Sequence, residues 1–168
     1  TRLDTAPAAE DVPVDVGAVV ERVEHMLSPL ARAVEVSLEL KLQPGCVVLA
    51  TEDDLYQIAF NLMENAVKYN LPGGRVLVTL TADGGRVVLR VEDTGVGIPK
   101  ADLPKIFDRF YRVDKARSRA AGGTGLGLSI VRDTVLQHGG AVTARRREPE
   151  GTCFEVSFAQ WNGEEVGR

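Results

Sequence analysis

Three polar side chains recur at helical spacing within residues 52–70. Asn61, Asn65 and Lys68 lie three or four residues apart, so at about 100° per residue they share one side of a helix. Amide oxygens suit Mg²⁺, which prefers oxygen ligands, and a lysine ammonium adds a point charge for phosphate. The stripe indicates one wall of a metal- and phosphate-binding cleft, although the boundary residues of any amphipathic helix give the same pattern.

A single aspartate follows a predicted strand in the segment EDTGVGIP, residues 92–99. The Asp93 carboxylate only accepts hydrogen bonds, so it suits an amino group such as the exocyclic amine of adenine. Gly95 and Gly97 would let the backbone pass close to a flat ring. An ordinary Asp-Gly turn is the plain alternative.

An aspartic protease is a second alternative for Asp93, because two Asp-Thr-Gly aspartates share a proton in that class. This sequence has one copy, so the chain would have to dimerise. Those proteases are almost wholly β-structured, whereas this chain carries three predicted helices. Both features argue against an aspartic protease.

The third segment is glycine-rich and reads GGTGLGLSI, residues 122–130. Gly122–Ser129 fits the phosphate-loop pattern G-x-x-x-x-G-K-[ST] except that Leu128 stands where the lysine should be. The preceding DKARSRAAG also lacks the pattern of a strand. Glycines nevertheless precede a helix whose first amides and dipole favour an anion, so we expect a phosphate-binding loop of another nucleotide fold.

Hydrophobic periodicity predicts the elements that must position these groups. Helices are expected after Asp15 and over residues 52–70 and 125–138, strands over 34–42 and 46–50, and hairpins with turns near 83–85 and 149–151. The core face of the first helix is predicted as Val16, Val19, Val20, Val23, Met26, Leu27 and Leu30. In the second helix the expected core face comprises Leu55, Ile58, Ala59, Leu62, Ala66 and Tyr69.

Interleaved helices and hairpins predict the fold class. Hairpins force antiparallel neighbours, so we expect an α/β (α+β) two-layer sandwich with a mixed, mostly antiparallel sheet and three main helices on one face.

Composition is typical of one soluble globular domain. The chain has 168 residues, a net charge of −4 and 44% hydrophobic residues, which argues against a broad nucleic-acid-binding surface. Cys46 and Cys153 lie in apolar runs without metal-ligand spacing, so we expect reduced core residues. No apolar run reaches the length of a membrane span. Because the sequence starts at Thr1 and not at Met, we expect it to be part of a longer protein.

Four segments, in this order, resemble the boxes of one protein family. NLMENAVKYN resembles the N box, EDTGVGIP the first glycine box, IFDRFYRVDKARSR the F box with its following lid, and GGTGLGLSIV the second glycine box. Together they resemble the catalytic, ATP-binding domain of bacterial sensor histidine kinases, which has the Bergerat fold. The resemblance covers about residues 15–160 and implies ATP and Mg²⁺ as cofactors.

The resemblance also implies a role for each matching residue. It implies Mg²⁺ binding by Asn65 with help from Asn61, and catalytic contacts to the phosphates from Asn61, Lys68, Arg112 and Arg117. The residues expected beside the base are Tyr69, Asp93, Gly95, Gly97 and Ile98. Those expected to wrap the phosphates are Gly123, Thr124, Gly125, Leu126 and Gly127. Phe107, Phe110 and Tyr111 are expected to anchor a lid of about residues 99–124.

The same resemblance predicts the domain organisation and the partners. Residues 1–13 would link to an upstream dimerisation and phosphoacceptor domain, residues 14–160 would form the catalytic domain, and residues 161–168 a tail. We expect that upstream domain and a response regulator as partners, and no nucleic acid. The resemblance implies that this catalytic domain is soluble and monomeric by itself. It also implies that the domain is the cytoplasmic part of an inner-membrane protein.

Asn61 bears on the choice between kinase and ATPase. ATPases of this fold place a glutamate at that position to activate water, and an amide cannot act as a base, so transfer is favoured over hydrolysis. A stand-alone serine kinase of the anti-sigma type is a further alternative. His25 in EHMLSPL resembles a phosphoacceptor box, but its spacing to Pro29 is one residue short, so we reject it as the acceptor. His138 ends a helix, and we interpret it as structural.

Overall fold

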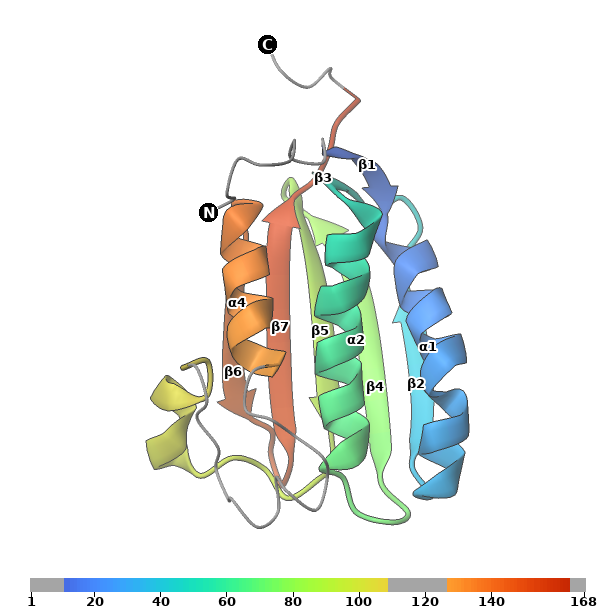
Figure 1. Cartoon of the computed structure of the whole chain (residues 1–168), viewed down its shortest axis with the longest axis vertical. Coiled ribbons are helices and arrows are strands. Elements are labelled where there is room, and N and C mark those ends of the chain that lie inside the picture. The colour runs from blue at the N-terminus through green and yellow to red at the C-terminus, as the bar shows by residue number, and fades with distance from the viewer. Residues whose placement is uncertain (1–10, 109–126, 164–168) are drawn as a thin grey trace, which may run out of the picture.

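A computed structural model describes residues 11–108 and 127–163 of the chain. In this part, three α-helices cover one face of a five-stranded sheet, and the other face of the sheet carries no helix (Figure 1). The helices are α1 (Val16–Ala33), α2 (Glu52–Lys68) and α4 (Gly127–Gln137), and a 3-10 helix, η1 (Lys100–Lys105), follows the fifth strand. The predicted two-layer sandwich is therefore confirmed.

The main sheet is mixed, as expected. Its strands are β2 (Ser37–Leu42), β4 (Arg75–Asp83), β5 (Arg86–Asp93), β7 (Thr152–Ala159) and β6 (Ala141–Arg146), in that spatial order. Only the β2–β4 pair is parallel, and the other three pairs are antiparallel. Both predicted hairpins form, and the pairing of β5 with β7 brings Asp93 and Thr152 opposite each other where β5 ends and β7 begins.

A second, two-stranded sheet pairs β1 (Val12–Asp15) with β3 (Val47–Ala50) in antiparallel register. The sequence predicts residues 12 and 13 as part of the linker of residues 1–13, without a strand. Pro13 obscures the strand signal, because proline lacks the amide that a central strand needs. Pairing with β3 extends only over four residues, which local sequence patterning does not reveal.

Capping side chains explain where the first two helices begin. The Asp15 carboxylate accepts hydrogen bonds from the amides of Gly17 and Ala18 at 3.0 and 3.4 Å, so α1 begins directly after Asp15, as predicted. Thr51 caps α2 in the same way, since its hydroxyl accepts the Asp54 amide at 3.1 Å. These contacts satisfy amides that have no partner within the helix.

The core lies between the helices and the sheet, and most of the predicted helix faces are buried there. Met26 is an exception, because it is 61% exposed although the pattern placed it on the core face of α1. At 100° per residue Met26 stands about 80° from the centre of the apolar stripe, beyond the arc that the sheet covers. Tyr69 is half-buried because it lies at the cap that ends α2.

His138 joins two helices, in agreement with the structural role expected for it. Its side chain is 3% exposed, and its Nε2 atom lies 2.8 Å from Oδ2 of Asp54 in the first turn of α2. Its Nδ1 atom lies 3.4 Å from Oδ2 of Asp11. The end of α4 is thereby tied to the start of α2, whereas Nδ1 makes no hydrogen bond within the described residues.

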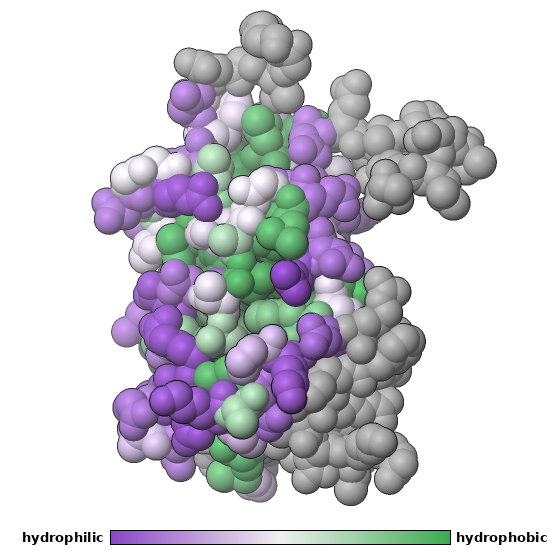
Figure 2. Space-filling model, turned by 90° about the vertical axis from the view of Figure 1, so that its left-hand side faces the viewer, coloured by the Kyte–Doolittle hydropathy of each residue, from purple (hydrophilic) through white to green (hydrophobic). Residues whose placement is uncertain are grey.

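Figure 2 shows the side of the molecule that carries α4 and β6, where apolar side chains form a narrow band between polar margins. Leu136 of α4 is among the large apolar residues that remain exposed, at 53%. No helix within the described ranges combines the length and apolarity that crossing a membrane requires.

Candidate functional site

The polar stripe on α2 is half-buried, and Asn61 and Gly127 come together across two elements. The side-chain amide nitrogen of Asn61 donates to the carbonyl of Gln57 at 2.9 Å. The other atom of the amide, Oδ1, faces the start of α4, because a Cβ added to Gly127 would lie 3.5 Å from it. The absence of a side chain at Gly127 keeps the space beside this oxygen open.

Asn65 lies one helical turn further along α2 and is also half-buried. Within the described residues its side-chain amide makes no hydrogen bond to the protein. Two amide oxygens one turn apart form a donor set of the kind that Mg²⁺ accepts, so the side chains present fit that ion.

Lys68, the cation predicted to contact phosphate, forms an ion pair on its own helix. Its Nζ atom lies 3.4 Å from Oε2 of Glu64, and both side chains are less than one-third exposed. Glu64 lies beside the stripe on the same helix and is its ion-pair partner. Residues four apart on a helix are neighbours on its surface, and the ion pair offsets part of the positive charge near the stripe.

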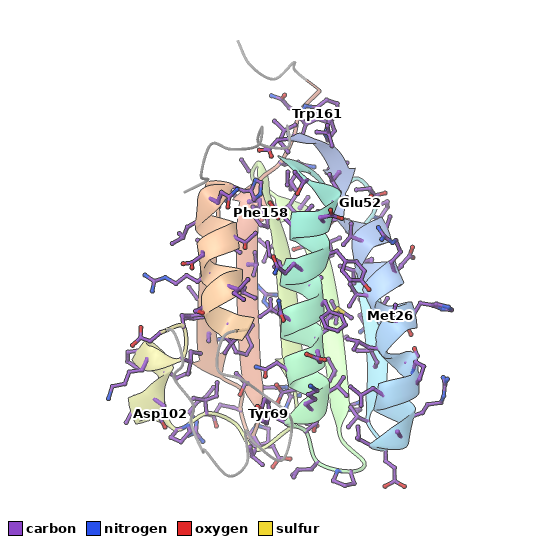
Figure 3. All side chains as sticks on the ribbon, viewed as in Figure 1. Met26, Glu52, Tyr69, Asp102, Phe158 and Trp161 are labelled. Atoms are coloured by element: carbon purple, nitrogen blue, oxygen red, sulfur yellow. The ribbon has the colours of Figure 1, made fainter. Side chains whose placement is uncertain are left out.

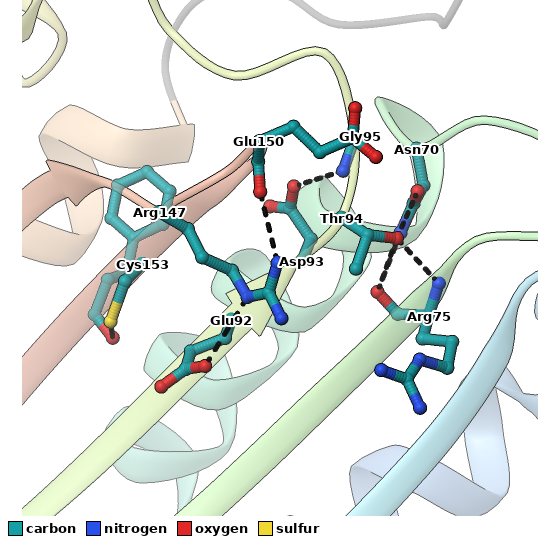
Figure 4. Close-up of polar contacts among 10 residues, drawn as sticks. Asn70, Arg75, Glu92, Asp93, Thr94, Gly95, Arg147, Glu150 and Cys153 are labelled. Atoms are coloured by element: carbon teal, nitrogen blue, oxygen red, sulfur yellow. Dashed lines mark hydrogen bonds and ion pairs between the residues drawn. The ribbon is translucent and has the colours of Figure 1, made fainter.

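Asp93 is the buried acceptor of the site, with 7% of its surface exposed. It is the last residue of β5, and its Oδ1 atom accepts the amide of Gly95 at 2.8 Å. That hydrogen bond fixes one carboxylate oxygen and shapes the turn that follows the strand (Figure 4). A carboxylate held in this way presents a directed acceptor at the end of the central strand.

The glycines after Asp93 are required by close backbone contacts. A Cβ on Gly95 would lie 2.6 Å from the carbonyl oxygen of Tyr69, so the turn and the end of α2 touch each other. Gly97 has φ +78°, and a Cβ there would lie 3.3 Å from the carbonyl oxygen of Gly151. Ile98 follows and packs against the core.

Gly151 and Thr152 lie next to Asp93, and the sequence analysis did not predict either residue as part of the site. Thr152 is 4% exposed and pairs with Asp93 across β5 and β7. A Cβ on Gly151 would collide with the carbonyl oxygen of Asp93. No local motif marks these residues, since their position depends on the register of two strands that are far apart in the sequence.

The expected lid is described only in part. Phe107 stands edge-on to Phe154 of β7, with ring centroids 6.1 Å apart, which agrees with its expected anchoring role. Leu128 packs against the core at the start of α4. The other predicted lid and loop residues lie outside the described ranges: Phe110, Tyr111, Arg112, Arg117, Gly123, Thr124, Gly125 and Leu126.

The groups named above gather at one end of the two-layer sandwich. Tyr69 at the end of α2 and Asp102 in η1 both lie at the lower end in Figure 3, whereas Glu52 at the start of α2 lies near the upper end. Asp93 ends β5 at the same lower end, where it pairs with Val76 near the start of β4. The arrangement sets a buried carboxylate beside a helix that carries amide oxygens and a lysine.

Comparisons with known proteins agree on one family. Residues 50–161 match the family described as histidine kinase-, DNA gyrase B-, and HSP90-like ATPase. Sensor-like histidine kinase SenX3 of Mycolicibacterium smegmatis is 35% identical over 162 residues, which cover 96% of this chain and 42% of SenX3. The chain thus spans less than half the length of this curated relative.

Two solved structures are also similar. The mycobacterial sensor histidine kinase MprB matches with a TM-score of 0.80 and 32% identity, over 89% of this chain and 98% of that one. Full-length ShkA in complex with AMPPNP matches with a TM-score of 0.78 and 33% identity, over 95% of this chain and 33% of ShkA.

Proposed function

Because this chain belongs to the histidine kinase-, DNA gyrase B- and HSP90-like ATPase family and is the ATP-binding catalytic domain of a sensor histidine kinase, we propose the following reaction. The domain binds Mg·ATP between the end of α2, the turn after β5 and the start of α4. It donates the γ-phosphoryl group to a histidine in an upstream dimerisation domain outside this chain, from which the group passes to a response regulator.

The observation that carries the proposal is the environment of Asp93. Its carboxylate is 7% exposed, and the Gly95 amide holds one of its oxygens. A buried, directed acceptor at a strand end suits the exocyclic amine of adenine, because that amine is a donor. The AMPPNP complex of the related ShkA supports an adenine nucleotide as the ligand.

We assign the phosphate end of the ligand to α2 and to the segment before α4. Asn65, assisted by Asn61, would hold Mg²⁺ through its amide oxygen, and Mg²⁺ would neutralise charge that develops on the phosphates. Lys68 would contact the phosphates from the same helix. Because Glu64 offsets part of the Lys68 charge, further cations would be needed to neutralise the phosphates.

Arg112 and Arg117 would supply that positive charge at the terminal phosphate. Tyr69, Gly97 and Ile98 would lie beside the base, and the amides of residues 123–127 would wrap the phosphates. Phosphoryl transfer mainly asks a protein for positioning and charge neutralisation, which these groups provide without a lysine in the glycine loop.

Transfer to another group is favoured over hydrolysis by the position of Asn61. A carboxamide has no basic group that could activate water, and the Asn61 nitrogen donates to the Gln57 carbonyl while its oxygen faces Gly127. The similarity to sensor histidine kinases favours histidine over serine as the acceptor. The family assignment also removes the aspartic-protease alternative.

The acceptor histidine lies outside this chain in our proposal. His25 is exposed on α1 of the catalytic domain itself, and His138 is buried between two carboxylates. We further propose that the whole protein is membrane-bound with this domain in the cytoplasm, that residues 1–13 connect to the dimerisation domain, and that the chain alone is monomeric.

Phosphorylation with γ-³²P-ATP tests the proposed reaction. This chain with Mg²⁺ and labelled ATP should remain unlabelled, whereas a version extended upstream through the phosphoacceptor domain should gain a label that is stable in alkali and labile in acid. Label on His25 of the unextended chain would contradict the separate acceptor. An acid-stable label would instead indicate a serine kinase.

A further inference from the structure

Thr94 follows Asp93 and points to the opposite face of the sheet. It lines a hollow of about 200 Å³ together with Arg75, Glu92 and Arg147 on the face that no helix covers. Successive strand residues alternate between faces, so Asp93 faces the ligand side and Thr94 the back. The two neighbouring residues therefore lie on opposite faces of the sheet.

Thr94 closes the end of the β4–β5 pair by two hydrogen bonds to one residue. The Arg75 amide donates to Oγ1 of Thr94 at 2.9 Å, and the Thr94 amide donates to the Arg75 carbonyl at 3.1 Å (Figure 4). The Thr94 hydroxyl lies 3.4 Å from both the Arg75 carbonyl and Oδ1 of Asn70. Its single proton can serve either acceptor.

Asn70 connects this strand end to α2. Its Nδ2 atom donates to the Arg75 carbonyl at 3.0 Å, and its Oδ1 atom accepts the Leu71 amide at 2.8 Å. Asn70 follows directly after Tyr69, the cap that ends α2. The side chains of Asn70 and Thr94 thus join the last turn of α2 to the ends of β4 and β5.

The link spans the two halves of the proposed nucleotide site. Asn65 and Lys68 lie in the last two turns of α2, and Asp93 ends β5. Gly95 touches the Tyr69 carbonyl, where a Cβ would come within 2.6 Å. Any shift of the turn after Asp93 relative to α2 would change the spacing between the base acceptor and the phosphate-binding groups.

We propose that Thr94 and Asn70 are positioning residues that make the domain selective for adenine, by fixing the Asp93 carboxylate relative to the end of α2. The inference rests on the proposed role of Asp93. A hydrogen bond weakens steeply when its angle or distance departs from the optimum. A loosened strand end would therefore weaken the bond to the adenine amine more than it weakens contacts to the phosphates.

Thr94→Val is the main test variant, since valine keeps the shape and removes the hydroxyl. Thr81→Val is its matched control, because Thr81 lies on the same strand pair, opposite Val88 and remote from Asp93, and its hydroxyl makes no hydrogen bond within the described residues. Thr94→Ser restores the hydroxyl. Asn70→Asp, which removes the donor to Arg75, provides an independent variant.

Calorimetry on this chain would measure the dissociation constants of Mg·ATP and of Mg·purine-riboside triphosphate, which lacks the 6-amino group. The readout is their ratio, in which phosphate and charge effects cancel because both ligands carry the same triphosphate. Wild type, Thr81→Val and Thr94→Ser should prefer ATP by roughly tenfold or more. In Thr94→Val and Asn70→Asp the ratio should fall to within about threefold of unity.

The possible results separate the inference from its premise. An unchanged ratio in folded Thr94→Val would overturn the inference and leave the role of Asp93 standing. If wild type itself does not discriminate, the role of Asp93 fails and the inference fails with it. If Thr94→Val does not fold, as judged by its circular dichroism, the ratio of Asn70→Asp decides in the same way.

Discussion

At the scale of single residues, Asn65 is the side chain that our account ties most closely to the metal. It lies half-buried on α2, one turn after Asn61, whose own amide nitrogen is held by the Gln57 carbonyl. A neutral amide can bind Mg²⁺ through its oxygen without repelling the phosphates that share the ion. A carboxylate at this position would repel them.

Asn65→Asp should therefore make ATP binding more dependent on Mg²⁺. Without the ion the new carboxylate repels the triphosphate, and with the ion the repulsion is largely offset, so the ratio of the dissociation constants in EDTA and in Mg²⁺ should rise by roughly tenfold, or about 1.4 kcal/mol. Gln57→Glu adds the same charge at an exposed position on α2 and should leave that ratio unchanged. Equal ratios in both variants would exclude Asn65 from the metal site.

Residue types and spacing predicted where several of these side chains lie, but not the partners that they contact. The stripe of Asn61, Asn65 and Lys68 followed from helical geometry, and the acceptor at Asp93 followed from its place after a strand. The Lys68–Glu64 ion pair was not predicted, although residues four apart on a helix are neighbours on its surface. Thr152 was missed because its place beside Asp93 depends on strand register.

At the scale of elements, the turn between β6 and β7 is in close backbone contact with the end of β5. Gly151 has φ +105°, and a Cβ there would collide with the Asp93 carbonyl. Arg147 ties the turn together, since its amide donates to the Gly151 carbonyl at 2.9 Å and its Nη1 atom donates to the Glu150 carbonyl at 3.1 Å. Its Nε atom also lies 3.6 Å from Oε1 of Glu92.

Gly151→Ala should destabilise the domain more than Gly45→Ala. Gly45 also has a positive φ, +83°, but a Cβ there meets nothing within 4 Å, so its substitution isolates the backbone penalty of about 1–2 kcal/mol. The collision at Gly151 should add about 1–3 kcal/mol. Urea unfolding would measure both losses in the free energy of unfolding, and equal losses would show that the turn does not press on Asp93.

Element boundaries show why local patterning stops short of the full fold. Both hairpins and the three helices were predicted, because capping residues, turn glycines and apolar periodicity act locally. The β1–β3 pair and the neighbours β5 and β7 join segments that are distant in the sequence. Only packing of the whole domain selects such pairs.

At the scale of the whole molecule, two cysteines are buried in the domain. Cys46 is 0% and Cys153 is 2% exposed, and both are free thiols. Burial raises the pKa of the Cys46 thiol, and the nearby Asp15 carboxylate raises it further. Burial is also the main cause of the raised pKa of Cys153.

The domain should therefore lose stability in alkali. Below about pH 8.5 the thiols are protonated in both states. Above it the unfolded chain releases protons that the native thiols retain, so the free energy of unfolding falls as pH rises. Urea unfolding at pH 7, 9 and 10 should show a steeper decline for wild type than for the double variant Cys46→Ala, Cys153→Ala. Parallel declines would show that the thiols do not contribute.

The central claim, that Asp93 recognises adenine in an Mg·ATP site, is tested most directly by calorimetric titration with Mg·ATP. We predict one-to-one binding by the wild-type chain and binding that is roughly tenfold weaker or worse for Asp93→Asn, because the new amide places a donor against the adenine amine. Asp83→Asn makes the same charge change at the exposed end of β4 and should bind as wild type does. Equal affinities for wild type and Asp93→Asn would contradict the account.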